Sequence, residues 1–285
     1  MQSIVEEWDI IIKPKNKLLD FKLKELHNYR DLLWLWVRRE YVGAYKQTLL
    51  GPLWHFISPI FSTLIYMLLY GKIAKLSTDG VPMFLFYNAG IAIWNFFNGC
   101  FGCAAGAFSN HAGIFGKVYF PRLIMPLASM VTTLIKFFIQ FSLFLFVYLY
   151  MIFLNGYHPI VTIWGLLYIP MALIITAGIG FGFGIIVSSI TTKYRDLTQL
   201  VGFGMQLLMF ATPVIYNISL VSQGIKKYIL FNPLVAPVES FKYALFGVGQ
   251  FSLNLLLYSI ITMILLLFSG LILFNRAEKN FMDVV

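Results

Sequence analysis

Cysteine and histidine offer the most recognisable chemistry in this chain, and both are few. Cys100 and Cys103 form a C-x-x-C pair, a spacing used for redox or metal chemistry in soluble proteins. Both lie inside an apolar run without neighbouring histidine or acidic residues, which favours small packing residues. The four histidines fall in separate segments, at His27, His55, His111 and His158. We therefore expect no metal site and no activated nucleophile, which argues against an enzyme.

Nucleotide chemistry is not expected in this chain either. The sequence contains no G-x-x-x-x-G-K-[ST] phosphate loop, and the spacing of its densest glycine run is wrong for a dinucleotide fingerprint. That run, Gly178, Gly180, Gly182 and Gly184, consists of two overlapped small-x-x-x-small pairs, which let a second helix approach closely. Carboxylates that would couple transport to an ion gradient are also missing from the apolar runs. We expect no cofactor here, with ATP and Mg bound by a partner subunit.

An aromatic stripe is the most unusual pattern in the apolar sequence. Tyr87, Trp94, Phe101 and Phe108 recur at every seventh residue, with Phe97 beside them. On a helix the stripe is ~31 Å long, about the thickness of the hydrocarbon layer. Aromatic faces suit the flat apolar faces of sugar rings, so the stripe is a candidate substrate path. Helix packing or lipid contact explains the same pattern.

One isolated cation lies within the apolar runs, and we assign it provisionally to the same path. Lys136 stands in the middle of the third run. A buried, unpaired cation in a membrane costs several kcal/mol. Lys136 therefore either extends toward the membrane surface or faces a polar conduit, and the sequence leaves both alternatives open.

Two short connections combine aromatic and basic residues. NHAGIFGKVYFPRLIMP joins the second and third apolar runs, and TTKYRDLTQ joins the fourth and fifth. Such loops either anchor the chain at the membrane surface or present side chains to a soluble partner, because Tyr, Phe and Arg contribute most to interface energy. The candidates are Phe115, Lys117, Tyr119, Phe120, Arg122, Tyr194 and Arg195.

The composition defines the class of protein that must position these residues. Hydrophobic residues make up 59% of the chain and charged residues 12%, values outside the range of soluble domains. The apolar runs are continuous, which predicts an all-α integral membrane protein instead of a barrel. No removable signal peptide is expected, because the first thirty residues are basic and polar. The net charge of +9 reflects basic membrane flanks and does not require nucleic acid.

Six transmembrane helices are predicted from the apolar runs. Fifteen of the 21 lysines and arginines fall on the side that contains both termini, which places the termini in the cytoplasm. The chain divides into a cytoplasmic segment, residues 1–51, and a transmembrane domain, residues 52–285. The predicted spans are Leu53–Tyr70, Met83–Phe108, Leu123–Phe153, Val161–Ile190, Leu197–Tyr216 and Phe251–Phe274.

An amphipathic helix is predicted over residues 22–48, before the first span. Arg38, Arg39 and Lys46 fall on its polar face together with Asp31, whereas Leu35, Glu40 and Val42 break the pattern. The helix is expected to lie at the membrane surface, where it either anchors the chain or docks a partner. The residues expected on its apolar face are Leu26, Tyr29, Leu33, Trp36, Val37 and Ala44.

A broken hairpin is predicted between spans five and six. Residues 216–250 are too polar for a plain span and too apolar for an ordinary loop. The segment suggests two short helices interrupted at Asn232 and Pro233, with Glu239 and Lys242 on the second. It is either a broken element covered by protein at membrane depth or a hairpin that caps the outer face as a gate.

Several stretches give the chain a resemblance to a known family. They are AYKQTLLGPLWHFISPIFSTLIY, GIFGKVYFPRLIMP, KYRDL, ATPVIY and NPLVAPVESFKYALFG, which occur in order over most of the chain. The chain resembles the membrane subunit of type 2 ABC exporters, in the branch that moves O-antigen, capsule or teichoic-acid polymers. Lys136 has no counterpart in that pattern.

The resemblance implies a function and a set of partners. It implies a homodimer with two ATPase subunits in a bacterial inner membrane, exporting a lipid-linked polysaccharide. It also implies that the N-terminal helix and the segment from Phe115 to Arg122 contact the ATPase. Export of a small drug or lipid by the same architecture is the alternative within transport. A structural membrane scaffold is the alternative from another class.

Overall fold

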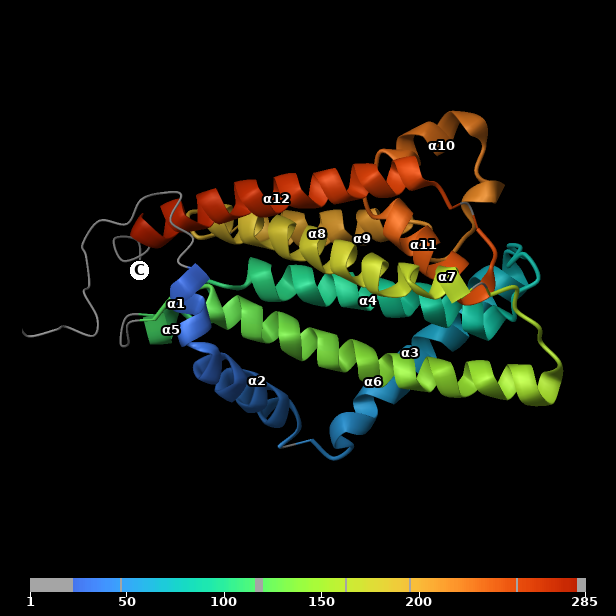
Figure 1. The fold of residues 1–285 in the computed structure, drawn as a ribbon, viewed down its shortest axis with the longest axis horizontal. Coiled ribbons are helices and arrows are strands. Elements are labelled where there is room, and N and C mark those ends of the chain that lie inside the picture. The colour runs from blue at the N-terminus through green and yellow to red at the C-terminus, as the bar shows by residue number, and fades with distance from the viewer. Residues whose placement is uncertain are drawn as a thin grey trace, which may run out of the picture.

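A computed structural model describes residues 23–46, 48–115, 120–161, 163–194, 196–249 and 251–280. Over these residues the fold is all-helical, without strands. The longer helices run roughly along one axis and form a bundle (Figure 1). They are α3 (Trp54–Tyr66) with its π-helical continuation η2 (Met67–Ile73), α4 (Met83–Ala105), α6 (Ile124–Asn155), α8 (Tyr168–Thr191), α9 (Leu197–Phe210) and α12 (Leu253–Asn280).

Shorter helices gather at the two ends of this bundle (Figure 1). One end, called the α5 end below, carries α1 and α5, together with the last turn of α12. The other, called the α11 end, carries α7, α10 and α11. The bounds of the shorter helices are α1 Leu23–Asn28, α2 Arg30–Tyr45, η1 Gly51–Leu53, α5 Ala112–Phe115, α7 Ile163–Leu166, η3 Ile218–Leu220, α10 Gln223–Leu230 and α11 Val235–Phe246.

The core forms around α4 and α8, and glycines allow these helices to approach closely. A Cβ on Gly180 would lie 3.0 Å from the carbonyl oxygen of Phe97 and 3.2 Å from the Cβ of Cys100. On the opposite side of α8, a Cβ on Gly182 would lie 2.8 Å from the backbone nitrogen of Leu267 in α12. The glycine run therefore packs α8 between α4 and α12, which confirms the small-residue interpretation. Cys100 is fully buried at this contact, as a packing residue.

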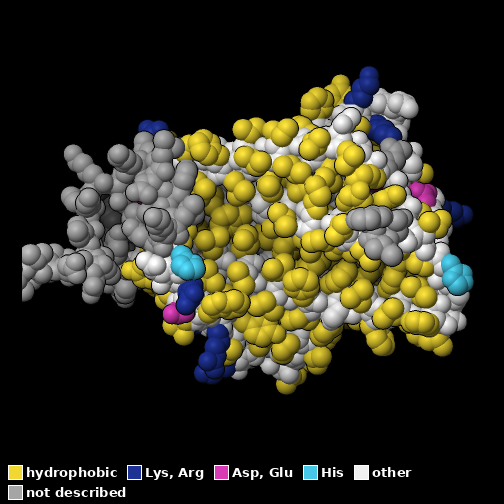
Figure 2. Space-filling model, viewed as in Figure 1, with side chains coloured by type: hydrophobic (Ala, Val, Ile, Leu, Met, Phe, Trp, Pro, Cys, Tyr) yellow, Lys and Arg dark blue, Asp and Glu magenta, His cyan; other side chains and the backbone are white. Residues whose placement is uncertain are grey.

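Within the described part of the chain, four helical segments are long and apolar enough to cross a bilayer, namely Gly51–Ile73, Ile124–Asn155, Tyr168–Thr191 and Leu253–Glu278. Helix α9 is apolar but shorter, and α4 carries three asparagines, Asn88, Asn95 and Asn98. Hydrophobic side chains cover the middle of the visible face, whereas charged side chains lie toward its ends (Figure 2). The arrangement is that of a multi-pass membrane protein. All six predicted span segments are helical, but the number of crossings remains a prediction.

Several helix ends differ from the predicted boundaries for local reasons. The fourth predicted span is divided, because α7 ends at Leu166 and α8 begins at Tyr168. The fifth ends at Phe210 instead of Tyr216, where the chain turns through Ala211 and Pro213, and a proline cannot continue the helical hydrogen bonds. The sixth extends to Asn280, beyond the predicted Phe274. The third ends at Asn155, and the next residue, Gly156, forms a left-handed cap with a φ of 65°.

Helices α1 and α2 occupy most of the segment predicted as an amphipathic helix, residues 22–48. Val37 is buried, and Leu26, Tyr29, Leu33 and Trp36 pack against the core near the start of α6. Ala44 is exposed, contrary to the pattern. Glu40, which broke the pattern, accepts a hydrogen bond from the Thr132 hydroxyl on α6 at 3.4 Å. This hydrogen bond explains how an acidic residue is accommodated on the side of α2 that packs against α6.

The broken hairpin is present, with its interruption at Asn232 and Pro233. The Asn232 amide donates to the Thr212 hydroxyl at 2.8 Å, and its carbonyl oxygen accepts from the backbone of Leu234 at 3.0 Å. No residue of α10 is buried, whereas almost every residue of α11 is. Helix α11 packs against α4, α8 and α12. This favours a broken element covered by protein over a hairpin that only caps the surface.

Candidate functional site

A groove of about 1010 Å³ opens between α4, α8 and α9. Its lining combines aromatic and apolar side chains with amides, hydroxyls and glycines. Its lining follows α4 from Trp94 to the end of the helix, which is about 16 Å of helical rise. The lining residues are Trp94, Asn98, Phe101, Gly102, Ala105, Gly106, Phe108, Ser109, Asn110, Val187, Ser188, Thr191, Thr192, Thr198, Val201, Gly202, Met205, Gln206 and Met209.

Small residues on the facing helices leave this space open. Gly102 on α4 and Gly202 on α9 have no atom within 4 Å of where a Cβ would stand. Asn98 on α4 and Gln206 on α9 also line the groove. Both are exposed polar residues on helices predicted to cross the membrane. Exposed amides on such helices are stable where they meet water or another polar surface, and costly against hydrocarbon. The groove therefore combines apolar side chains with amides and hydroxyls among the spanning helices.

The predicted aromatic stripe divides between the groove and the core. Trp94, Phe101 and Phe108 line the groove, although each is at least nine-tenths buried and presents only part of its ring. Tyr87 and Phe97 do not line it and are almost fully buried in the core. Seventh-residue spacing places side chains on one helix face, but it does not show which part of that face a neighbouring helix covers.

Aromatic packing fixes the rings of the groove wall. The Phe97 ring stacks on Phe101 with centroids 6.5 Å apart, and Phe101 lies 5.3 Å from Phe183 of α8. Phe108 stacks on Phe274 of α12 at 4.6 Å, and its backbone donates to the Ser188 hydroxyl at 3.4 Å. These contacts hold the wall rigid, which suits a binding surface that must not collapse.

Lys136 is not part of the groove lining, contrary to its assignment to the substrate path. The groove is lined by residues between Trp94 and Asn110 and between Val187 and Met209, whereas Lys136 belongs to α6. Its side chain is half-buried. Lys136 therefore does not line this groove, and its place on a substrate path stays a prediction.

Three basic residues of α2 and its end are available to a partner. Arg38, Arg39 and Lys46 are exposed, as expected for the predicted ATPase contact. The Arg39 guanidinium lies 4.3 Å from the ring centroid of Trp36, which restrains it while leaving it accessible. The His111 ring packs against the same tryptophan, with the two ring centroids 5.9 Å apart. Burial lowers the pKa of His111, with Arg39 acting in the same direction and Glu40 opposing it.

In the connection between α4 and α6, two of the residues expected to contact the ATPase are buried or half-buried. Phe120 is buried, and Arg122 is half-buried, with its guanidinium donating to the Glu278 carbonyl oxygen at 3.0 Å and lying 3.8 Å from the Glu278 carboxylate. Burial lowers the pKa of Arg122, and Glu278 partly offsets this. These two residues tie the start of α6 to the end of α12. Lys117 and Tyr119 lie outside the described residues, as does the side chain of Phe115.

The turn between α8 and α9 exposes a further basic and aromatic pair. Tyr194 is exposed, and the Lys193 ammonium lies 5.2 Å from its ring centroid. Arg195, the other predicted contact residue here, lies outside the described residues. Sequence reasoning did not single out Lys193, although its place beside Tyr194 in a basic turn was a usable signal.

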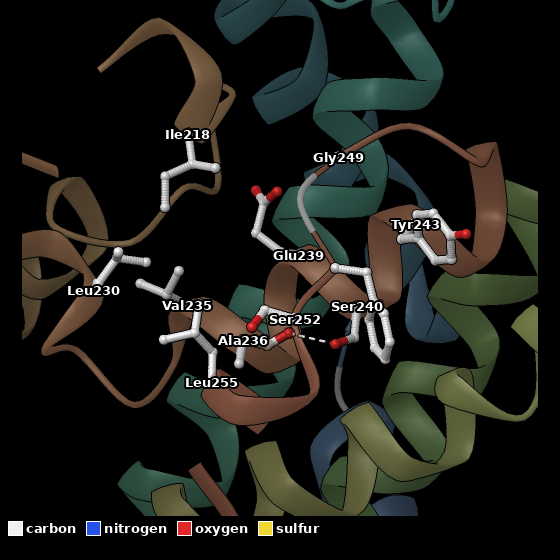
Figure 3. Close-up of a pocket in the computed structure, with 11 residues that line it drawn as sticks. Ile218, Leu230, Val235, Ala236, Glu239, Ser240, Tyr243, Gly249, Ser252 and Leu255 are labelled. Carbon is white, nitrogen blue, oxygen red and sulfur yellow. Dashed lines mark hydrogen bonds between the residues drawn. The ribbon is translucent and has the colours of Figure 1, made fainter. Parts of the chain in front are cut away.

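A second cavity of about 520 Å³ opens at the α11 end, and it is lined by one of the residues predicted for the outer hairpin, Glu239 (Figure 3). The Glu239 side chain points into this space, near Ile218 and Gly249 (Figure 3). Lys242 does not line the cavity. Its ammonium donates to the carbonyl oxygens of Pro213 at 2.5 Å and Tyr216 at 3.3 Å, and it lies 4.1 Å from the Phe86 ring centroid.

Lys242 therefore fastens α11 to the turn that follows α9. The cation is fully buried, and charge-assisted hydrogen bonds to two carbonyls compensate part of its desolvation. The other predicted gate residues, Asn232 and Pro233, form the break in the hairpin. The structure does not test a gating role for any of the four.

Fold and site together define a multi-pass membrane protein with a groove of mixed apolar and hydrogen-bonding side chains among its helices. A family model described as "ABC-2 type transporter" matches residues 31–246. The chain belongs to this family, which confirms the resemblance. Permeases of the family are transport subunits that normally work with an ATP-binding subunit.

Curated relatives cover nearly the same length of chain. A Myxococcus xanthus protein named "O-antigen export system permease protein RfbA" is 29% identical over 222 residues, which is 77% of this chain and 82% of that protein. Two Klebsiella pneumoniae proteins of the same name are 27% and 26% identical over 259 residues, covering 90% of this chain and 95% of theirs. This chain is similar to all three.

Proposed function

We propose that this chain is the membrane subunit of an ATP-driven exporter that carries a lipid-linked polysaccharide across the bacterial inner membrane. The observation that carries the proposal is the groove, which combines aromatic rings with amides and hydroxyls over about 16 Å of α4. Aromatic faces and neutral hydrogen-bonding groups are suited to sugar rings. The names of the full-length relatives support the same class of substrate.

The proposal includes two ATPase subunits that bind at the α5 end. Exposed Arg38, Arg39, Lys46 and Tyr194 supply the basic and aromatic chemistry for such a contact. The excess of basic residues on the same side supports a cytoplasmic location of both ends of the chain. Closure of the ATPase pair would push on α2 and on the connections at this end, and rigid movement of the helices would transmit the push to the groove.

The proposal also includes a second copy of this chain. The groove is open along part of its length and is flanked by exposed apolar residues of α9, including Phe203, Leu207 and Phe210. A second copy would complete a conduit that one chain leaves open, and twofold assembly is the commonest form of closure.

Deletion of the gene in the native bacterium tests the proposed substrate. We expect surface polysaccharide to disappear and lipid-linked polymer to accumulate inside the cell, with restoration by the intact chain. Purification of the tagged chain should recover an ATP-hydrolysing subunit. Normal surface polymer with no internal accumulation would overturn the proposal.

Export of a small drug or lipid is the second candidate. The groove volume of about 1010 Å³ is near the upper end of pockets that hold drug-sized molecules. In that case the deletion would leave surface polymer unchanged and would raise sensitivity to a toxic compound or alter lipid distribution.

A further inference from the structure

The described residues that line the groove include no ionisable side chain. The polar part of the lining consists of amides and hydroxyls, represented by Asn98, Thr191 and Gln206. We propose that the groove selects uncharged polysaccharide and disfavours polymers that carry carboxylate or phosphate groups along the chain. This inference rests on the proposed function and narrows its substrate class.

Among the described residues near the groove, the charged ones lie beyond its lining. Lys193 and Asp196 are exposed at the turn between α8 and α9, next to the lining residues Thr192 and Thr198. Glu239 and Lys242 belong to α11 and to the surroundings of the second cavity. A charged group could therefore meet a counter-ion at the mouth of the groove, but not among the described residues of its wall.

The wall treats neutral and anionic sugars differently. Amides and hydroxyls both donate and accept hydrogen bonds, so they can replace water around a sugar hydroxyl. An anion would lose hydration without gaining a compensating cation, and uncompensated charge is costly in a partly buried site. The faces of Trp94 and Phe101 carry negative electrostatic potential, which adds a small repulsion.

Binding of two matched probes to the full chain in lipid nanodiscs tests the inference. The probes are a fluorescent dextran oligomer and a carboxymethylated dextran oligomer of the same length, measured by fluorescence anisotropy. We expect the neutral probe to bind at least about tenfold more tightly, the effect of one poorly compensated charge.

Two substitutions of the same residue type locate the selectivity. Gln206→Lys places a cation in the groove, so it should raise affinity for the carboxymethylated probe several-fold. Gln223→Lys adds the same charge at the exposed start of α10, outside the groove, and should leave both affinities unchanged. Circular dichroism and size-exclusion chromatography check that each variant is folded.

The outcomes separate this inference from the proposed function. Equal affinity of the native chain for both probes would overturn charge selectivity while retaining glycan binding. An equal effect of the two lysine substitutions would show that general charge, and not the groove, controls binding. Failure of the folded native chain to bind either probe would overturn both the inference and the glycan groove.

Discussion

At the scale of single residues, glycines, which have no side chain, determine how closely the central helices approach. A Cβ on Gly184 would lie 2.5 Å from the carbonyl oxygen of Phe101 and 2.6 Å from the Cβ of Ala104. Backbone atoms cannot move aside as the end of a flexible side chain can. The contact that keeps α8 beside the groove wall on α4 therefore depends on glycine at this position.

Gly184→Val should destabilise the protein by about 1–3 kcal/mol, because the new side chain overpacks the contact between α4 and α8. Thermal unfolding of the purified protein in detergent measures the change. Gly204→Val is the matched control, since no atom lies within 4 Å of a Cβ at Gly204. Equal loss of stability in both variants would contradict the packing explanation.

At the scale of the element, α4 presents different chemistry to its several neighbours. Its buried residues Tyr87 and Phe97 belong to the core, whereas Trp94 and Phe101 reach the groove. All four are aromatic, so residue type alone does not distinguish them. The position of α9, which begins at Leu197, leaves part of α4 uncovered and so determines which rings are available to substrate.

Replacing Trp94 and Phe101 together with alanine should lower polymer export per folded molecule, in addition to the loss of stability that follows from truncating two buried rings. Each ring contributes roughly 1 kcal/mol of contact, or about fivefold in rate if the loss falls on the transport step. Surface polymer is quantified per amount of folded permease. Phe97→Ala is the control, because Phe97 does not line the groove, and it should lower stability more than export per folded molecule. Unchanged export in the double variant would show that the aromatic stripe serves only to pack the helices.

Helix α2 supports a separate prediction about the partner. Arg38→Glu with Arg39→Glu should lower ATP-dependent export roughly tenfold by placing like charges against the expected contact. The assay compares ATP hydrolysis and export in the assembled transporter. Lys72→Glu with Lys227→Glu makes the same change of charge at exposed positions away from α2 and should have little effect. Normal export and assembly of the α2 variant would exclude the contact.

At the scale of the whole molecule, the described chain begins at α1 and ends with α12 at the same end of the bundle (Figure 1). This arrangement agrees with an even number of crossings, as the charge pattern predicts. The groove opens between helices that continue toward this end, where the exposed arginines of α2 also lie. A force applied at this end of the bundle would act close to the groove. It would not have to be transmitted along the whole length of the helices.

Helix positions were predictable from sequence because every segment predicted to span contains a continuous apolar run. The break at Asn232 was predictable from its proline. The groove was not, because periodicity places Trp94 and Phe97 on the same helix without showing which neighbour covers each. The roles of Arg122 and Lys242 also depend on distant partners, Glu278 and the carbonyls of Pro213 and Tyr216, which no local pattern reveals.

Transport by the purified chain, reconstituted in liposomes with and without its ATPase subunit, tests the central claim most directly. Lipid-linked polymer is placed on the side that carries the ATPase, and its appearance on the opposite side is measured after ATP is added. The account predicts transfer only when both subunits and hydrolysable ATP are present. Transfer by this chain alone, at the rate of the complete assembly, would contradict it.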